Sequence, residues 1–177
     1  MEDNYVKLAK KAVIKAVTGG NPGGIEELRT SLPDVSRGVF VTLKKLDGEL
    51  RGCIGTYSPV TESLDKEILR NASSAALDDP RFSPVKPNEL TELTLSVDVL
   101  SPPEPCEKGD LEPDRYGIIV KKGTKSGLLL PDLDGVNSVE RQIEVTKKKA
   151  GIPPTDENYE LQRFEVSRHE GETPIER

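Results

Sequence analysis

The sequence has no tryptophan and only one histidine, one methionine and two cysteines among its 177 residues. One His and two distant Cys cannot supply the four ligands of a structural zinc site, so we expect no metal and no cofactor. A Ser-His-Asp or Cys-His catalytic device is disfavoured for the same reason, because His169 lies in a segment that lacks a hydrophobic anchor. The dinucleotide motif Gly-x-Gly-x-x-Gly is also absent.

Basic charge and long apolar runs are missing as well. The net charge is −6 with a pI near 5.0, which argues against a general nucleic-acid binder because such proteins need a basic footprint. No apolar run approaches the ~18 residues of a membrane span, and the N-terminus shows no signal-peptide hydrophobic region. Cys53 and Cys106 could form a disulfide, but nothing else suggests secretion, so we expect a reduced, cytoplasmic protein.

The length suits one domain over residues 1–177. The patterns predict an α+β fold in which hairpins and antiparallel strands are packed by two or three helices. The Pro-rich segment 101–105 breaks the pattern and indicates a subdomain boundary. No internal repeat or low-complexity segment is present.

The most informative stretch is the predicted hairpin of residues 38–46 and 50–56. Asp47-Gly48 between two β-rich arms predicts a two-residue turn, in which paired positions sum to 95. This register places Arg51 and Cys53 together on the face away from the core, with Lys44 opposite Arg51 and Thr42 opposite Cys53. Glycines on both sides of the cysteine suggest a bulge, or the close approach of a ligand or a second backbone.

Helical periodicity appears in three places. Asn4 is the predicted cap of a first helix, which ends at the Gly-rich run 18–24; we interpret that run as a connector because it lacks the Gly-Lys-Ser/Thr ending of a phosphate loop. Ser58 and Pro59 predict the start of a second helix that ends before Pro80. Asn137 and Glu140 resemble a capping box, and Gly151 is the expected stop of that third helix.

The remaining strands follow from alternation and turn residues. Residues 93–99 alternate strictly, and 117–120 and 127–130 are short strands around the basic turn 121–126. Residues 159–166 predict a last strand, and the tail from Arg168 onward is expected to be disordered.

Cys53 is the candidate with chemical potential. Positive charge from Arg51 and Lys44 on the same predicted face would favour its thiolate, and a guanidinium beside a thiol also suits binding of a carboxylate or phosphate. The alternative is that Cys53 is a small buried hydrophobic residue and Arg51 an ordinary surface residue. Cys106, in the Pro-rich connector, is interpreted as incidental.

Four segments together resemble the AMMECR domain family, in this order: Gly-Val-Phe-Val-Thr-Leu at 38–43, Leu-Arg-Gly-Cys-Ile-Gly-Thr at 50–56, Asp-Pro-Arg-Phe at 79–82 and Leu-Pro at 130–131. The resemblance runs from about Tyr5 to Val166. It implies two subdomains with antiparallel sheets flanked by helices, and a cleft bordered by the Arg-Gly-Cys-Ile-Gly signature. It also implies a functional link to MEMO-like and radical-SAM proteins, but it does not supply an activity.

Two function classes stay open at this point. In the first, the cleft binds a small anionic molecule and supports cysteine-centred catalysis, with Cys53 as the candidate catalytic residue. In the second, the chain is a non-enzymatic module that binds a protein or peptide. The candidate ligand-binding residues are Arg51, Gly52, Ile54, Gly55, Thr56, Asp79 and Arg81.

Overall fold

The computed structural model describes residues 2–176 and shows an α+β fold with antiparallel sheets, as the sequence predicted. The chain divides into two compact units. Unit 1 comprises the residues up to Val99 together with those from Ser167 onward, and unit 2 comprises Leu100–Val166. Unit 1 is therefore discontinuous in sequence, whereas unit 2 is one continuous segment.

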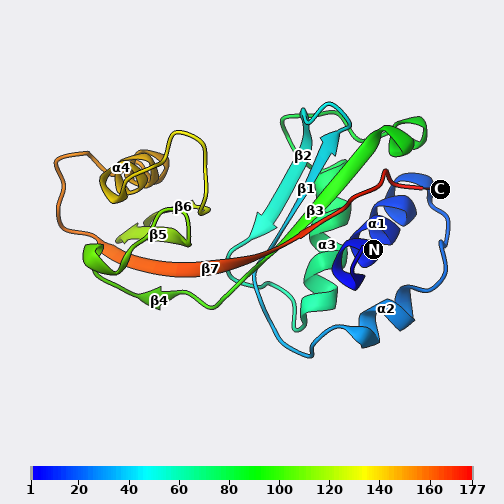
Figure 1. Ribbon diagram of the computed structural model, residues 1–177, viewed down its shortest axis with the longest axis horizontal. Helices are drawn as coiled ribbons and strands as arrows, with labels where there is room; N and C mark the ends of the chain where they lie inside the picture. The colour runs from blue at the N-terminus through cyan, green and yellow to red at the C-terminus, as the bar shows by residue number, and fades with distance from the viewer. Residues whose placement is uncertain (1, 177) are drawn as a thin grey trace. The chain divides into compact units, whose positions relative to one another are not determined.

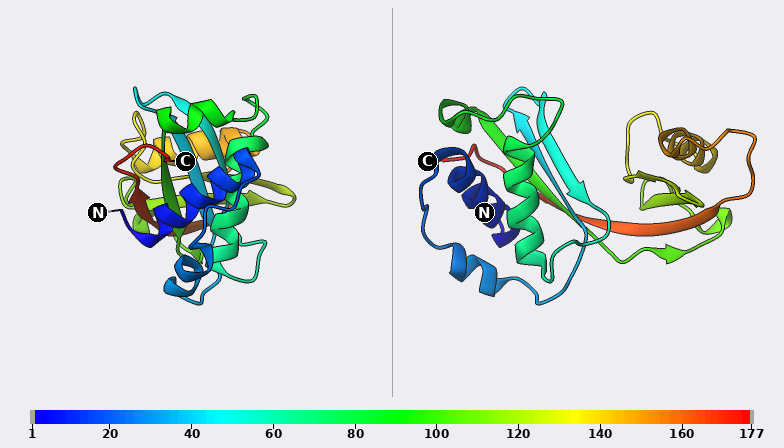
Figure 2. Two further views of the ribbon diagram at one scale, coloured as in Figure 1. Left: turned by 90° about the vertical axis from the view of Figure 1, so that its right-hand side faces the viewer. Right: turned by 180° about the vertical axis from the view of Figure 1, so that it is seen from behind.

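Unit 1 packs helices against one face of an antiparallel sheet in the order β2-β1-β3, and β3 is followed by β7 (Glu160–Glu170), whose last residues belong to this unit (Figure 1). Its elements are α1 (Asn4–Thr18), α2 (Ile25–Ser31), β1 (Val39–Lys45), β2 (Leu50–Thr56), α3 (Leu64–Leu77), the 3-10 helix η1 (Pro87–Glu92) and β3 (Leu93–Leu100). Helices α1 and α3 lie side by side, and α3 covers β1 and β2 (Figure 2). Between them lies an apolar core to which β1 contributes Val39, Val41 and Leu43, each fully buried.

The β1–β2 hairpin keeps the predicted register over most of its length. Val39 pairs with Thr56 and Thr42 with Cys53, and this continues to Leu43 opposite Gly52. Beyond that pair a β-bulge shifts the register, so that Lys44 faces Leu50. The prediction that Lys44 lies opposite Arg51 is therefore wrong, because Arg51 is the extra residue of the bulge.

The hairpin turn also differs from the prediction. The N–H of Lys45 bonds to the carbonyl of Glu49, which leaves a three-residue loop of Leu46, Asp47 and Gly48. Only Gly48 takes a positive φ, of 89°, and its N–H returns to the carbonyl of Lys45. A turn followed by a left-handed glycine is the usual three-residue hairpin connection, and it does not require a positive φ at Asp47.

Unit 2 packs one helix against antiparallel strands in the order β6-β5-β7, with the short β4 on the far side of β7. Its elements are β4 (Glu104–Pro105), the 3-10 helix η2 (Lys108–Asp110), β5 (Tyr116–Lys122), β6 (Lys125–Leu129), α4 (Val139–Ala150) and β7 (Glu160–Glu170), of which β7 ends within unit 1. Helix α4 packs on β5 and β6. It ends at Gly151, as predicted, with a φ of 70°.

Three predicted helix starts are wrong by one or more residues. Asp3, not Asn4, caps α1, and Ser138, not Asn137, caps α4. Helix α3 begins at Leu64, well after Ser58, because side-chain hydrogen bonds hold the preceding backbone in a non-helical conformation. There the N–H groups of Val60 and Thr61 donate to the carboxylate of Glu67, and residues 57–63 form a bent segment instead of a helix.

The tail predicted to be disordered is ordered through residue 176. Its backbone bonds to β3, with the N–H of Gly171 on the carbonyl of Leu95 and that of Ile175 on the carbonyl of Leu93. The Ile175 side chain is fully buried in the core of unit 1. One apolar residue in a polar tail carries too little periodic signal to be recognised in the sequence.

Candidate functional site

The signature strand β2 is an edge strand, and side chains bind its outward-facing backbone at Cys53. The N–H of Cys53 donates to Oδ2 of Asp79 at 2.9 Å, and its carbonyl accepts from Nη2 of Arg81 at 3.3 Å. Arg81 also donates to both carboxylate oxygens of Asp79, through Nε at 3.0 Å and Nη2 at 2.7 Å. An exposed strand edge is a template for unwanted pairing, and here charged side chains occupy it.

The Arg81 guanidinium is the largest influence on Asp79. Its hydrogen bonds hold the pKa of the Asp79 carboxyl well below its ordinary range, and burial of the carboxylate opposes this without outweighing it. The backbone N–H groups of Cys53 and Arg81 lower the pKa further. Asp79 is therefore a permanently ionised acceptor at neutral pH, which suits a structural anchor better than an acid or base.

The Cys53 thiol lies on the sheet face opposite α3, half-buried, with Sγ 3.3 Å from Oγ1 of Thr42. Because the backbone N–H and C=O of Cys53 both bond to side chains, Cys53 and Thr42 form a non-hydrogen-bonded pair, in which side chains approach closely. Thr42 also pairs with Ser96 of β3, so a thiol and two hydroxyl groups form one row across the sheet.

Arg51 is buried at the bulge, with only 7% of its surface exposed. Its Nε and Nη2 donate to the two carboxylate oxygens of Glu89 in η1, at 2.8 and 3.1 Å. These bonds are the main reason that the pKa of Glu89 lies below its ordinary value, with burial acting in the opposite direction. Among the residues that the structure describes, no acceptor bonds to Nη1 of Arg51.

A cavity of about 450 Å³ lies beside Arg51. Its lining combines three cations, two carboxylates, two polar side chains and two apolar ones: Lys45, Arg51, Lys86, Glu49, Glu89, Ser83, Asn88, Leu50 and Phe82. Cys53, Asp79 and Arg81 do not line it. Arg51 therefore lines the cavity. The Cys53 thiol does not line it and lies on the sheet face opposite α3.

Arg51 and Arg81 nevertheless lie near one another. Their guanidinium carbons are 6.0 and 5.5 Å from the centroid of the same ring, that of Phe82. This half-buried phenyl ring therefore joins the Arg51 cavity to the Asp79–Arg81 anchor.

The two glycines beside Cys53 have separate packing reasons. A Cβ on Gly52 would lie 2.2 Å from the carbonyl oxygen of Ala75 in α3, so strand and helix approach too closely for any side chain. A Cβ on Gly55 would lie 2.2 Å from the Phe40 ring. Gly52 thus accounts for the predicted approach of a second backbone.

The last two candidate residues of the signature face the interior. Ile54 packs against the core of unit 1. Oγ1 of Thr56 donates to the buried carboxylate of Glu67 and accepts from Nδ2 of Asn71 at 3.0 Å. Burial opposes ionisation of Glu67, but the bonds from Thr56 and Thr61 outweigh it and lower the pKa.

Sequence reasoning missed Glu67 and Asn71, and it missed the two cavity residues of η1, Asn88 and Glu89. A buried acid and amide in the apolar stripe of a helix, as at Glu67 and Asn71, are a signal that could have been noticed. Glu89 offered none, because a short 3-10 turn has no hydrophobic periodicity.

With this geometry in place, comparison with known proteins defines the class. The chain is an α+β domain with an anchored edge hairpin, and the AMMECR1 family model matches residues 6–169. The chain belongs to the AMMECR1 family.

Relatives and a solved structure agree with this assignment. A protein of Thermotoga maritima is 47% identical over 173 residues, covering 95% of this chain and 98% of that protein. A protein of Clostridium acetobutylicum is 48% identical over 172 residues, but this chain spans only 36% of its length. The crystal structure of an uncharacterized protein from Pyrococcus horikoshii is 35% identical, with a TM-score of 0.83 over 96% of this chain and 91% of that one.

No helix within residues 2–176 combines the length and apolar character needed to cross a membrane.

Proposed function

We propose that this AMMECR1-family chain binds a small anionic ligand beside the signature hairpin, in the cavity next to Arg51. The observation that carries the proposal is the buried guanidinium of Arg51, which lines a cavity of about 450 Å³ and has an Nη1 without an acceptor among the described residues. Glu89 fixes the guanidinium fork in place, so its remaining N–H groups are oriented before a ligand arrives.

The lining supports an anion over a cation. Lys45, Arg51 and Lys86 outnumber Glu49 and Glu89, and Lys45 is already bonded to Glu49 at 2.6 Å. Lys86 therefore adds positive charge beside the guanidinium fork. The fork matches a carboxylate or a phosphate in two-point geometry, which lysine cannot reproduce.

The test is a titration with pyrophosphate, followed by NMR of the Arg51 Nε–H and by calorimetry. We expect saturable binding that weakens with salt, and a loss of about tenfold or more in affinity for Arg51→Lys. Arg29→Lys is the matched control, because Arg29 bonds to Asp65 and Glu26 in the same unit but not in the cavity. The proposal fails if millimolar pyrophosphate leaves the Arg51 resonance unmoved, or if both variants bind like the wild type.

We propose in addition that the site supports catalysis centred on Cys53. It is supported by the half-buried Cys53 thiol, whose backbone is held between Asp79 and Arg81. The thiol bonds to Thr42 and to no base among the described residues. Ligand binding is therefore better supported than catalysis, because an activated thiol needs a neighbouring base.

A protein- or peptide-binding module is the second candidate function. The observation in its favour is the segment that follows β2, where Tyr57 is 37% and Val60 is 62% exposed. Two exposed apolar side chains beside the signature strand suit a peptide contact. Binding of pyrophosphate blocked by Val60→Asp would favour a shared surface, whereas an unaffected titration would separate the two sites.

The proposal includes a cytoplasmic location. It is supported by Cys53 and Cys106, which are both free thiols, as expected in a reducing compartment.

A further inference from the structure

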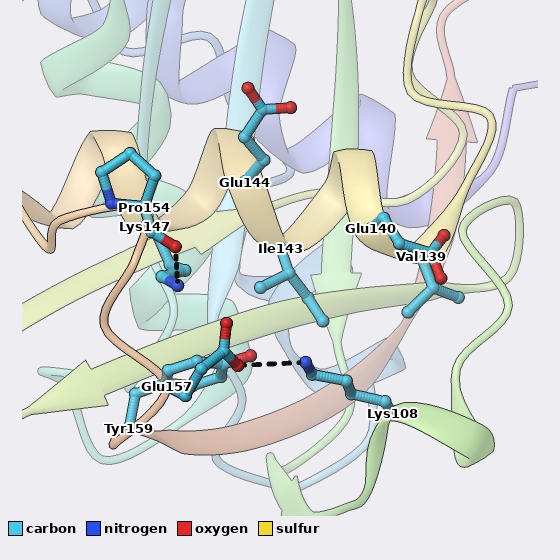
Figure 3. Close-up of a pocket in the computed structure, with 9 residues that line it drawn as sticks. All are labelled: Lys108, Val139, Glu140, Ile143, Glu144, Lys147, Pro154, Glu157 and Tyr159. Atoms are coloured by element: carbon cyan, nitrogen blue, oxygen red, sulfur yellow. Dashed lines mark hydrogen bonds and ion pairs between the residues drawn. The ribbon is translucent and has the colours of Figure 1, made fainter.

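The one histidine of this chain lies outside both cavities described for the two units. In unit 2 a cavity of about 210 Å³ lies between α4 and the side chains of Lys108 and Glu157 (Figure 3). Its lysines are held by neighbours: Lys108 pairs with Glu157 at 3.3 Å, and Lys147 donates to the carbonyl of Pro154 at 2.9 Å. None of the described residues that line it is a serine, a cysteine or a histidine. A Ser-His or Cys-His pair must therefore be sought elsewhere in the molecule.

The last part of β7, in unit 1, carries Ser167 and His169 on one face of the strand. These residues are two positions apart, so their side chains point the same way, while Arg168 between them points to the opposite face and bonds to Asp98 at 2.8 Å. Oγ of Ser167 lies 3.2 Å from Nε2 of His169. A hydroxyl nucleophile and an imidazole base are therefore within hydrogen-bond distance.

A carboxylate contacts the other nitrogen of the same imidazole. Oδ2 of Asp3, at the start of α1, lies 2.5 Å from Nδ1 of His169. Because a carboxylate only accepts hydrogen bonds, the proton of the neutral imidazole sits on Nδ1 and Nε2 is left as an acceptor. Ser167 then donates its O–H to Nε2, which is the direction that a general base requires.

Neighbouring contacts fix both the carboxylate and the imidazole. Oδ1 of Asp3 accepts from the N–H of Val6 at 3.1 Å as the cap of α1. The His169 ring stacks on the ring of Tyr5, with centroids 4.0 Å apart and planes at 19°, and only 16% of its side chain is exposed. The imidazole is thus oriented before a substrate arrives.

The expectation that His169 lies in a segment without a hydrophobic anchor is wrong. Ile175 is fully buried in the core of unit 1, and the N–H of Gly171 donates to the carbonyl of Leu95 in β3. These contacts hold the chain in place directly after His169. The reason for disfavouring a Ser-His-Asp device therefore does not apply to the folded chain.

We propose that Ser167, His169 and Asp3 form a Ser-His-Asp triad that hydrolyses carboxylic esters. Ser167 Oγ attacks the ester carbonyl carbon while His169 Nε2 takes the hydroxyl proton. The C–O bond to the leaving group then breaks, and the imidazole passes this proton to the departing alcohol, which leaves an acyl ester on Ser167. Water attacks this ester next. His169 takes a proton from the water and returns it to Ser167 Oγ as the carboxylic acid departs.

The location of the triad indicates the kind of ester. Ser167 is exposed on β7, and none of the three residues lines the cavity beside Arg51. An open site of this kind admits an ester group at the end of a larger molecule, because no wall limits the size of the acyl or alcohol part. Asp3 contacts the imidazole only and is therefore a positioning residue, whereas Ser167 and His169 contact the reacting atoms.

The first experiment treats the full chain with diisopropyl fluorophosphate, which transfers its phosphoryl group to activated serines and releases fluoride. Peptide mass spectrometry locates the label. We expect it on Ser167 and not on Ser36, an exposed serine of the same unit whose hydroxyl donates to the Thr61 carbonyl instead of an imidazole. His169→Gln should slow the labelling by about 100-fold or more. Equal labelling of the two serines, no label on Ser167, or a wild-type rate in His169→Gln would each overturn the proposal.

Hydrolysis of p-nitrophenyl acetate measures turnover. Wild type should release more p-nitrophenolate than there is protein, since the acyl-serine is hydrolysed and the site is regenerated. Ser167→Ala should lower this steady rate by at least about tenfold, whereas Ser36→Ala should retain it. A steady rate that Ser167→Ala leaves unchanged would assign the reaction to other groups and reject the triad.

Asp3→Asn tests the carboxylate while keeping the helix cap, since Asn caps helices as well as Asp does. The amide can donate to Nδ1 of His169, which favours the Nε2–H tautomer, and this tautomer cannot accept the Ser167 proton. We expect labelling and turnover to slow by about tenfold or more with little change in the melting temperature. Nitrogen NMR of the imidazole reads the tautomer directly, with Nδ1–H expected in the wild type and Nε2–H in Asp3→Asn. An Nε2–H imidazole in the wild type, or an unchanged rate in the variant, would contradict the role of Asp3.

Discussion

The carboxylate of Asp79 accepts a hydrogen bond from the backbone N–H of Cys53 at 2.9 Å, in the position where a neighbouring strand would otherwise bond. A buried side chain thus holds the edge of the signature strand, and Arg81 completes the contact from the carbonyl side. The segment 79–82 is therefore an anchor for β2.

Asp79→Asn should lower the free energy of unfolding by about 2–3 kcal/mol at neutral pH, since it removes charge-assisted hydrogen bonds from a buried acceptor. Urea unfolding measures this. Asp114→Asn, at an exposed carboxylate, is the control and should change stability by less than about 0.5 kcal/mol. Equal effects of the two variants would remove the anchor role.

Asp79 should also make the free energy of unfolding depend on pH. The folded-state pKa of Asp79 is depressed, so its contribution is complete above its unfolded pKa, near 3.9, and is lost as the pH falls below that value toward the folded-state pKa. The stability gap between wild type and Asp79→Asn should therefore shrink in acid. A gap that is constant from neutral pH to about pH 2 would contradict this assignment.

Gly52→Ala should destabilise the protein by more than about 1 kcal/mol, because the new methyl group would lie against the Ala75 carbonyl, an atom fixed in the backbone of α3. Gly109→Ala is the control: a Cβ there meets nothing within 4 Å and the backbone does not require glycine. Thermal unfolding of both variants decides the matter, and an unchanged melting temperature for Gly52→Ala would exclude the packing reason.

Cys53 should be alkylated by iodoacetamide several times faster than Cys106 in the native protein at pH 7. Burial raises the pKa of the Cys106 thiol, which lowers the fraction of reactive thiolate at that site. Peptide mass spectrometry against time measures both rates at once. Labelling of Cys53 only after denaturation would end the nucleophile hypothesis and leave the binding function.

Ile175→Ala should lower the free energy of unfolding by about 2–4 kcal/mol, as expected for a fully buried aliphatic side chain. Glu176→Ala, one residue further and exposed, should have almost no effect. A small effect of both substitutions in urea unfolding would mean that the tail contributes nothing to the core of unit 1.

The sequence was most informative where local rules and tertiary packing agree. The strict alternation of 93–99 and the end of a helix at Gly151 follow from side-chain period and from the left-handed region that glycine adopts readily. The hairpin register from Val39 to Leu43 was also predictable, because one face of β1 is purely aliphatic.

The candidate site was less predictable because distant residues decide its geometry. The bulge at Arg51 accompanies a bidentate bond to Glu89, which is 38 residues away in the chain. Likewise, Ser58-Pro59 has the residue types of a helix start. The carboxylate of Glu67 accepts hydrogen bonds from the backbone of Val60 and Thr61, however, and the helix begins only at Leu64. The sequence could place Arg51 and Cys53 on one strand, but not the bulge beside Arg51 or the cavity that Arg51 lines and Cys53 does not.

The discontinuity of unit 1 has a consequence for the order of events during synthesis. Its last part, which begins at Ser167 and includes Ile175, leaves the ribosome only after all of unit 2 has been made. At roughly 5–20 residues per second, residues 100–166 alone take several seconds, during which β3 still lacks the backbone partners that Gly171 and Ile175 supply. Unit 2 is continuous and can fold first, so the N-terminal half of this protein should be the last to become resistant to proteases on the ribosome.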